Sequence, residues 1–249
     1  MIAYGDFRTT GKDLEGSPAH RKEFHMILIP GGWFWMGSEG RYSWESPRHR
    51  VFVSGFRIAP TAVTRGEYHA FLEATGHPMP KGWTSPEFSN PEQPAVGMSW
   101  FDAISYCEWI STKRGEPFRL PTEAEWEKAC RGGADGAEYP WGDLLPSSLP
   151  YFQGGWTGPR PVRDGVTNAF GLFHMGDNVH EWCSDWFDPN YYAHSPQADP
   201  AGPESGTRRV SRGGSWRHLV KASRNAHRSS LPPQFRYTDY GFRLVSSLL

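Results

Sequence analysis

The stretch from Arg212 to Val245, RGGSWRHLVKASRNAHRSSLPPQFRYTDYGFRLV, has two regular ends and an irregular middle. It opens on a Gly-Gly-Ser-Trp turn and closes on Gly-Phe-Arg-Leu-Val, which has the composition of a strand. The residues between them mix charged, aromatic and aliphatic side chains without the period of a helix or a strand. The middle could be an active site, a binding surface or a plain loop. The other segments of the sequence help to decide among these three possibilities.

Upstream of this stretch, apolar runs between turn residues predict short strands. FHMILIPGGWFWMG, residues 24–37, places two such runs around Pro30-Gly31-Gly32 and predicts a β-hairpin. HRVFVSGFRI, residues 49–58, predicts one further strand. The remaining strand candidates are residues 171–174, 181–186, 209–212 and 242–245.

Three helix starts share one signal, a capping box in which a hydroxyl residue precedes a carboxylate residue by three positions. It occurs at Thr64–Glu67, Ser99–Asp102 and Thr122–Glu125. Behind each start, apolar residues recur on one helix face. This pattern predicts that Cys107 and Cys130 are packing residues of the core.

Composition predicts a single loop-rich domain. The chain of 249 residues contains 12 Trp, 28 Gly and 22 Pro, which is typical of an aromatic core joined by many turns. No internal repeat and no linker divides it. We therefore expect one mixed α+β domain over residues 23–249, preceded by a polar arm over residues 1–22.

The formal net charge of −1 argues against a nucleic-acid partner or a membrane-surface role. Residues 208–243 are nevertheless locally basic, with eight Arg and Lys221 against the single carboxylate of Asp239. The sequence has no apolar run of membrane-spanning length, no signal-peptide pattern, and no disulfide or zinc-ribbon spacing among its three cysteines. We expect a cytoplasmic monomer with reduced cysteines.

Taken together, several stretches resemble the formylglycine-generating enzyme family, also called the sulfatase-modifying factor domain. The resemblance covers residues 24–245 and rests, in order, on MILIPGGWFWMGS, SPRHRVFVSGFRIAPTAVTRGEYHAFL, PAVGMSWFDAISYCEWI, FRLPTEAEWEKACRGG, YPWGD, NAFGLFHMGDNVHEWCSDWF, SRGGSW and GFRLV. It implies a single domain related to C-type lectin folds.

The resemblance implies a member without the family's copper site. In members that generate formylglycine, two cysteines in the C-terminal segment hold copper(I), for which thiolates are suitable soft ligands. The matching positions are Val220 and Asn225, and residues 217–240 contain no cysteine. We therefore expect no copper and no copper-dependent oxidation of a substrate cysteine.

A structural calcium site is implied by the resemblance of residues 175–182, MGDNVHEW, to a loop of the family. Its hard oxygen ligands would be three carbonyls and one carboxylate, those of Gly176, Asp177, Val179 and Glu181. Two alternatives stay open. The Glu181 carboxylate could tie the loop by hydrogen bonds alone, or His174 and His180 could form an iron-type site with the carboxylates nearby.

Residues 217–240 also resemble the diversified segment of variable proteins of diversity-generating retroelements, which serves as a ligand-binding surface. Mixed clusters alternate here with the supports RGGSW, SRNA, PP and GFRLV. The resemblance implies a surface for a protein or small-molecule ligand, made by Arg217, His218, Leu219, Val220, Lys221, Ser223, Asn225, His227, Leu231, Phe235, Tyr237, Thr238, Asp239 and Tyr240.

The alternative function is that of a copper-independent family enzyme that matures or oxidises a peptide or a small molecule. Among sequence motifs, a nucleophile elbow, a metalloprotease helix, a phosphate-binding loop and a dinucleotide fingerprint are all missing. Sequence motifs alone therefore favour the binding surface.

Overall fold

All three predicted capping boxes form, and each starts a helix. The computed structural model describes residues 25–143 and 157–248 of the chain. Its helices are α1 (Arg65–Thr75), α2 (Trp100–Arg114) and α3 (Glu123–Arg131). In each, the cap hydroxyl accepts from the third helical amide, and the carboxylate at that position accepts from the cap amide. Each helix ends at a left-handed glycine, namely Gly76, Gly115 and Gly132.

The first two strands do not form the predicted hairpin. β1 (Ile27–Ile29) pairs with β4 (Phe56–Ile58), whereas β2 (Gly32–Met36) pairs with β3 (His49–Val53). The prediction of one strand over residues 49–58 is also wrong, because that segment breaks between β3 and β4. Residues 27–36 and residues 49–58 thus each contribute one strand to each of two sheets, and both pass from one sheet to the other at neighbouring points.

Close approach at these points requires glycine. A Cβ added to Gly31 would lie 3.0 Å from the backbone nitrogen of Gly55. The two glycines therefore mark a crossing between sheets, for which a local sequence pattern gives no signal.

The third sheet carries the C-terminal segment. Its strand order is β7 (Arg228–Leu231), β6 (Arg209–Arg212), β5 (His180–Trp186) and β8 (Tyr240–Gly241). β5 and β8 are parallel, and β9 (Val245–Ser247) adds to β4 in the first sheet. The predicted strand at 209–212 is confirmed and the one at 181–186 starts one residue earlier. Residues 171–174 form no strand, and residues 242–244 lie between β8 and β9.

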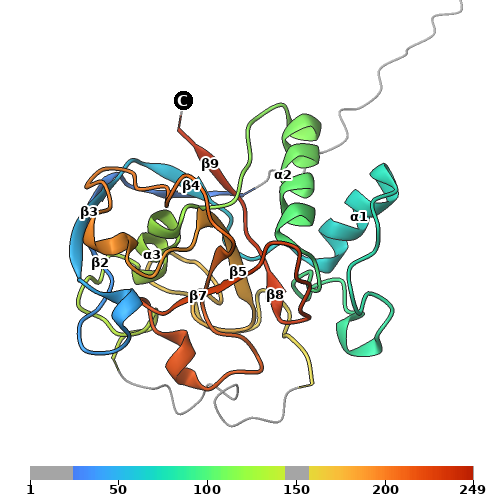
Figure 1. The fold of residues 1–249 in the computed structure, drawn as a ribbon. Coiled ribbons are helices and arrows are strands. Elements are labelled where there is room, and N and C mark those ends of the chain that lie inside the picture. Colours follow the sequence, from blue (N-terminus) through green and yellow to red (C-terminus); the bar gives the residue numbers. More distant parts are fainter. Residues whose placement is uncertain (1–24, 144–156, 249) are drawn as a thin grey trace, which may run out of the picture.

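Two large hydrophobic clusters and a smaller third one fill the interior. One large cluster lies around α3 and includes Trp126 and Cys130, and the other lies between α1, α2 and β8 and includes Tyr68 and Cys107. Figure 1 shows α1 and α2 together on one side of the molecule, with α3 among the strands on the other. The predictions of a mixed α+β domain and of buried packing cysteines are confirmed.

Short 3-10 turns connect these elements, at η1 (Ser43–Glu45), η2 (Pro86–Phe88), η4 (Tyr191–Ala193) and η5 (Val220–Ser223). Within residues 25–143 and 157–248, helices are too short or too polar to cross a membrane. The predicted arm, residues 1–22, lies outside the described residues.

Candidate functional site

Buried arginines hold both regular ends of the C-terminal segment in place. Arg212 has no exposed surface and contacts the carboxylates of Glu123 and Glu127 on α3. At the other end, Arg243 donates to both oxygens of Glu181 at 2.6 Å. Because breaking a buried ion pair leaves an uncompensated charge, these arginines fix the framework.

Two further buried arginines anchor the segment between those ends. Arg224 donates to the two carboxylate oxygens of Glu45 at 2.7 Å each. Arg228 donates to the two oxygens of Glu123 at 2.7 and 2.8 Å. Four of the nine cationic side chains of residues 208–243 are therefore internal, and the loops between these anchors carry the exposed residues.

The first half of the predicted surface divides into an outer and an inner part. Its exposed side chains are those of Arg217, His218, Leu219 and Lys221, with Val220 and His227 half-buried. Ser223 and Asn225 are buried, so their assignment to a binding surface is wrong. Asn225 donates to the Ala137 carbonyl at 3.0 Å and accepts from the Cys130 thiol at 3.1 Å, which makes it a loop tie.

The second half divides in the same way. Phe235 and Tyr237 are exposed, and Leu231 and Thr238 are half-buried. Tyr240 and Asp239 are buried, at 6% and 5% exposed, so neither is a surface contact as predicted. Tyr240 belongs to β8 and packs on Trp182, with 5.1 Å between ring centroids.

The loop that carries Phe235 and Tyr237 is fixed to the start of α2. Trp100 donates its amide to the Pro233 carbonyl at 2.9 Å, and Arg236 pairs with Asp102 at 3.0 Å. Backbone hydrogen bonds of this kind lower the entropy that a loop loses when it binds a ligand. The exposed aromatic rings therefore stand on a rigid support.

A series of rings connects this loop to the interior. Phe235 lies 6.1 Å from Tyr237, which lies 6.2 Å from Tyr240, measured between centroids. Tyr240 is 4.8 Å from the His180 ring, and His180 is 4.8 Å from the His218 ring. The structure thus brings both halves of the predicted segment together at His180.

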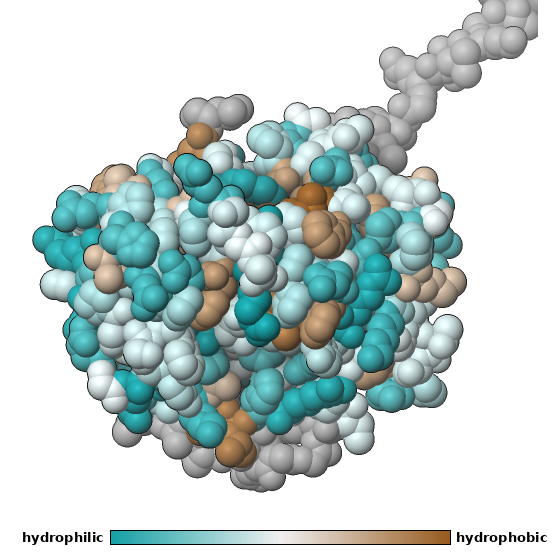
Figure 2. All heavy atoms as spheres, in the orientation of Figure 1, coloured by the Kyte–Doolittle hydropathy of each residue, from teal (hydrophilic) through white to brown (hydrophobic). Residues whose placement is uncertain are grey.

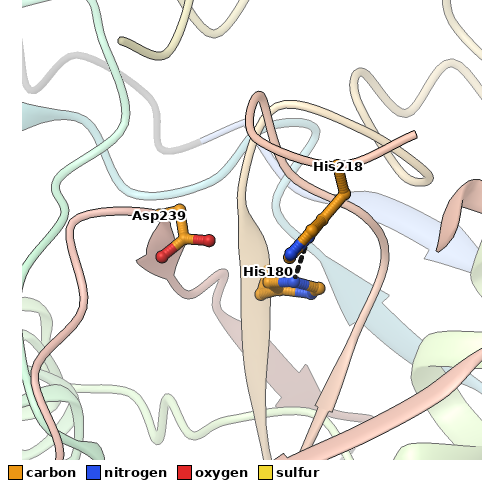
Figure 3. Close-up of side chains that lie close together, drawn as sticks. All are labelled: His180, His218 and Asp239. Atoms are coloured by element: carbon orange, nitrogen blue, oxygen red, sulfur yellow. Dashed lines mark hydrogen bonds between the residues drawn. The ribbon is translucent and has the colours of Figure 1, made fainter. Parts of the chain in front are cut away.

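Two histidines, a serine and an aspartate meet at this point. The Nε2 atom of His180 lies 2.9 Å from Nδ1 of His218, and the Ser215 hydroxyl lies 3.1 Å from both His218 Nδ1 and an Asp239 oxygen. Figure 3 shows the two imidazole rings tilted against each other, with their facing nitrogens joined by the hydrogen bond and the Asp239 carboxylate to one side. Their ligand atoms lie within 4.8 Å of one another.

Both imidazoles of this cluster are neutral at neutral pH. Burial, with His218 as the next cause, lowers the pKa of His180 to about 3. Although the His218 side chain is exposed, partial loss of solvent around its ring also lowers the pKa of His218. Each ring therefore keeps a lone pair that can accept a proton or bind a metal ion.

The donors of the predicted calcium loop do not fit that ion as they are placed. Both oxygens of Glu181 are taken by Arg243, and one of them also accepts from the Trp126 indole at 2.7 Å. The Gly176 carbonyl accepts from the Gly214 amide at 2.9 Å. A guanidinium on the carboxylate leaves it no charge for a cation, so calcium here stays a prediction without support from the geometry.

The alternative iron-type set is not assembled either. His174 contacts Asp177 at 3.0 Å, whereas His180 faces His218 from the C-terminal segment. The sequence suggested His174 as the partner of His180, whereas in the structure His180 contacts His218. Ser215 was not predicted at all, because its contact with Asp239 spans 24 residues and such a contact has no periodic signal.

The three cysteines do not form a reactive site. Each is free and buried. Burial raises the pKa of the thiols of Cys107, Cys130 and Cys183 above their ordinary value. Buried neutral thiols are poor nucleophiles and poor metal ligands.

Two clefts lie outside the predicted surface. One of 280 Å³ is lined by residues that include Arg41, Arg131 and Arg224, and the other, of 490 Å³, by residues that include Pro60 and Arg163. The fourteen predicted residues line neither of these two clefts. On the face that carries β7 and β8, Figure 2 shows hydrophobic side chains as separate patches among hydrophilic ones.

Comparison with known proteins agrees with this fold. Residues 12–248 match the family model described as the sulfatase-modifying factor enzyme 1-like domain. The formylglycine-generating enzyme of Streptomyces coelicolor is 34% identical over 284 aligned positions, which cover 89% of this chain and 88% of that protein.

Two solved structures are similar along nearly the whole chain. PvdO from Pseudomonas aeruginosa has a TM-score of 0.78 at 31% identity and covers 90% of this chain and 94% of its own. Treponema denticola variable protein 1 has a TM-score of 0.76 at 26% identity and covers 90% and 95%, respectively. The chain is thus similar both to a protein named as a formylglycine-generating enzyme and to one named as a variable protein.

Proposed function

Because the chain belongs to the sulfatase-modifying factor enzyme 1-like family, the family of the formylglycine-generating enzymes, we propose that it uses this scaffold to bind a ligand through its C-terminal segment. The observation that carries the proposal is the placement of Leu219, Phe235 and Tyr237. These large side chains are 66%, 42% and 41% exposed, although they stand on loops fixed by buried ion pairs. Rigid exposed aromatic residues are typical of binding surfaces.

The shape of the region favours a protein or peptide as ligand. Small-molecule sites are concave, and the predicted residues line neither of the two clefts described above. Around the three apolar side chains, Arg217 and Lys221 supply exposed positive charge. This combination suits a partner that presents apolar residues together with carboxylates.

The similarity to Treponema denticola variable protein 1 supports the same function. The exposed residues of the segment sit between framework residues that cannot change without loss of a buried ion pair, such as Arg212, Arg224 and Arg228. A diversified surface needs this separation of permissive from fixed positions. Sequencing codons 217–240 in a population of the source cells would test whether the permissive positions vary at adenine-templated sites.

The direct test removes the exposed side chains without touching the framework. A triple variant, Leu219→Ser, Phe235→Ser and Tyr237→Ser, is compared with wild type by panning a displayed library of random peptides. We expect peptides that bind wild type to lose at least about tenfold in affinity for the triple variant. The melting temperature (Tm) should change by only a few degrees, because the replaced side chains are exposed.

The matched control is Phe101→Ser, which removes an aromatic ring that is 54% exposed on α2. Selected peptides should bind this variant as they bind wild type. Equal binding to wild type and to the triple variant would contradict the proposal. Unfolding of the triple variant would show instead that these side chains are structural.

The polar cluster below the surface favours a copper-independent enzyme as the second candidate. Two neutral imidazoles, a hydroxyl and a carboxylate could move protons for a bound substrate. For that function, His218→Ala should abolish conversion of a peptide or small molecule, while Leu219→Ser should spare the chemical step.

A further inference from the structure

The cluster of His180, His218 and Asp239 has the composition of a metal site rather than of a loop tie. Two imidazole nitrogens and one carboxylate are the protein ligands of many zinc and non-haem iron sites. Their side chains come from the start of β5, from the loop after the Gly-Gly-Ser turn and from the residue before β8. Residues so far apart in sequence meet here because the sheet brings them together (Figure 3).

The spacing of the two rings fits a shared ion. The nitrogen atoms that face each other, His180 Nε2 and His218 Nδ1, are 2.9 Å apart. Two nitrogens bound to one tetrahedral ion at about 2.1 Å would be separated by about 3.4 Å, so the two rings need to part by only about 0.5 Å. The third ligand lies farther out, since the cluster spans up to 4.8 Å. A rotation of the Asp239 side chain that brings one oxygen to about 3.4 Å from both nitrogens would complete a tetrahedral set of ligands.

The backbone around these ligands is already fixed. The His180 amide donates to the Asp239 carbonyl at 2.9 Å, and the His218 amide donates to the Ser215 carbonyl at 2.9 Å. The Trp216 amide donates to the Asn178 carbonyl at 2.9 Å, which ties the loop of His218 to the loop before β5. A site held in this way loses little entropy when an ion binds.

Charge also favours an ion at this point. Glu45, Glu127 and Glu181 each contact an arginine at 2.7 Å or less. In contrast, the nearest cation described for Asp239 is Arg217, at 4.0 Å and on a side chain that is 42% exposed. The Asp239 carboxylate is thus less well compensated than the framework carboxylates, and a bound cation would offset its charge.

From this geometry we propose that His180, His218 and Asp239 bind one divalent transition-metal ion of the zinc type, with Ser215 hydrogen-bonded beside it. The imidazole of His218 lies at the surface, so the ion can enter from solvent. The proposal goes beyond ligand binding by the outer residues and does not depend on it.

The experiment titrates the full chain with Zn²⁺ by calorimetry, after removal of any histidine tag and dialysis against a chelator. We expect about one ion per chain in wild type, and a loss of at least about tenfold in affinity in His218→Ala and in Asp239→Asn. His218 is exposed and Asn has the shape of Asp, so these two variants should fold. Binding should also raise the Tm of wild type and not that of either variant.

His77→Ala is the matched control, because it removes an imidazole that contacts another carboxylate, that of Asp102, at 2.8 Å. This variant should bind Zn²⁺ as wild type does. Substitution of Co²⁺ gives a second readout, a visible spectrum that reports nitrogen and oxygen ligands. The proposal is overturned if wild type binds no Zn²⁺, or if wild type and both variants bind it equally. Either result leaves the peptide-binding test of the outer residues unaffected.

Discussion

The same residue type has opposite roles at different positions of the C-terminal segment. Arg212, Arg224, Arg228 and Arg243 are buried and paired with glutamates, whereas Arg217 is exposed. A buried guanidinium persists only where carboxylates and carbonyls satisfy its donors. The choice between framework and surface is therefore made by the partner that each side chain meets.

Glu181 gives a prediction at this scale. Since Arg243 and Trp126 occupy its oxygens, neither calcium nor a calcium chelator should shift the Tm by more than about 1 °C. Glu181→Gln should lower the free energy of unfolding by about 3–5 kcal/mol with or without calcium, because it leaves a buried guanidinium unpaired. Thermal and urea unfolding measure both quantities.

Glu204→Gln, at an exposed carboxylate, is the control for that experiment and should change little. A calcium-dependent rise in the Tm of wild type that disappears in Glu181→Gln would reverse the conclusion. The loop would then bind calcium with its arginine displaced.

At the scale of elements, the ion pair between Glu45 of η1 and Arg224, the residue after η5, fixes the exposed loop at residues 217–221. Burial raises the pKa of Glu45, but the His227 ring 3.6 Å away and hydrogen bonds from Arg224 and Ser38 outweigh it and lower that pKa to about 2. The unfolded chain binds a proton at Glu45 near pH 4.5, whereas the folded chain does so only near pH 2. The stabilisation is therefore complete above about pH 5 and is lost as pH falls towards 2.

We expect Glu45→Gln to reduce the free energy of unfolding by about 2 kcal/mol at pH 7, and by progressively less as pH falls from about 5 to about 2. Urea unfolding of both proteins over this range gives the difference. Glu73→Gln serves as the control, since its carboxylate is exposed and meets only His69. A difference that does not depend on pH would mean that Glu45 contributes by packing and not by its charge.

At the scale of the whole molecule, residues 242–245 of the C-terminal segment are an interior element. β9 completes the first sheet, and Phe242, Arg243, Leu244 and Val245 have no exposed surface. The exposed loops of the C-terminal segment thus lie, along the chain, between two framework segments, 209–212 and 241–247. If these loops bind the ligand as proposed, their outer residues can change while the framework is kept.

Truncation tests this arrangement. A chain that ends at Tyr240 should not unfold cooperatively, because it loses at least about 5 kcal/mol of apolar burial and the partner of Glu181. Deletion of residues 1–22, the arm predicted from sequence, should keep a cooperative transition with a similar Tm. Calorimetry distinguishes the two outcomes. Cooperative unfolding of the chain that ends at Tyr240 would mean that the C-terminal strand is dispensable.

The sequence by itself determined the local features and, through resemblance, the scaffold. The capping boxes at Thr64, Ser99 and Thr122 were predicted because each is closed within four residues, so no distant contact can override it. The core positions of Cys107 and Cys130 followed from helical periodicity.

Only the tertiary structure decided which strands pair and which residues of the segment face outward. The hairpin expected at residues 24–37 does not form, because β1 pairs with β4 and β2 pairs with β3, both within residues 49–58. The side chains of Asn225 and Tyr240 are buried, whereas those of Leu219 and Tyr237 are exposed. His180 met His218 and Asp239 across 38 and 59 residues. Such contacts depend on how sheets pack, and packing leaves no period in the sequence.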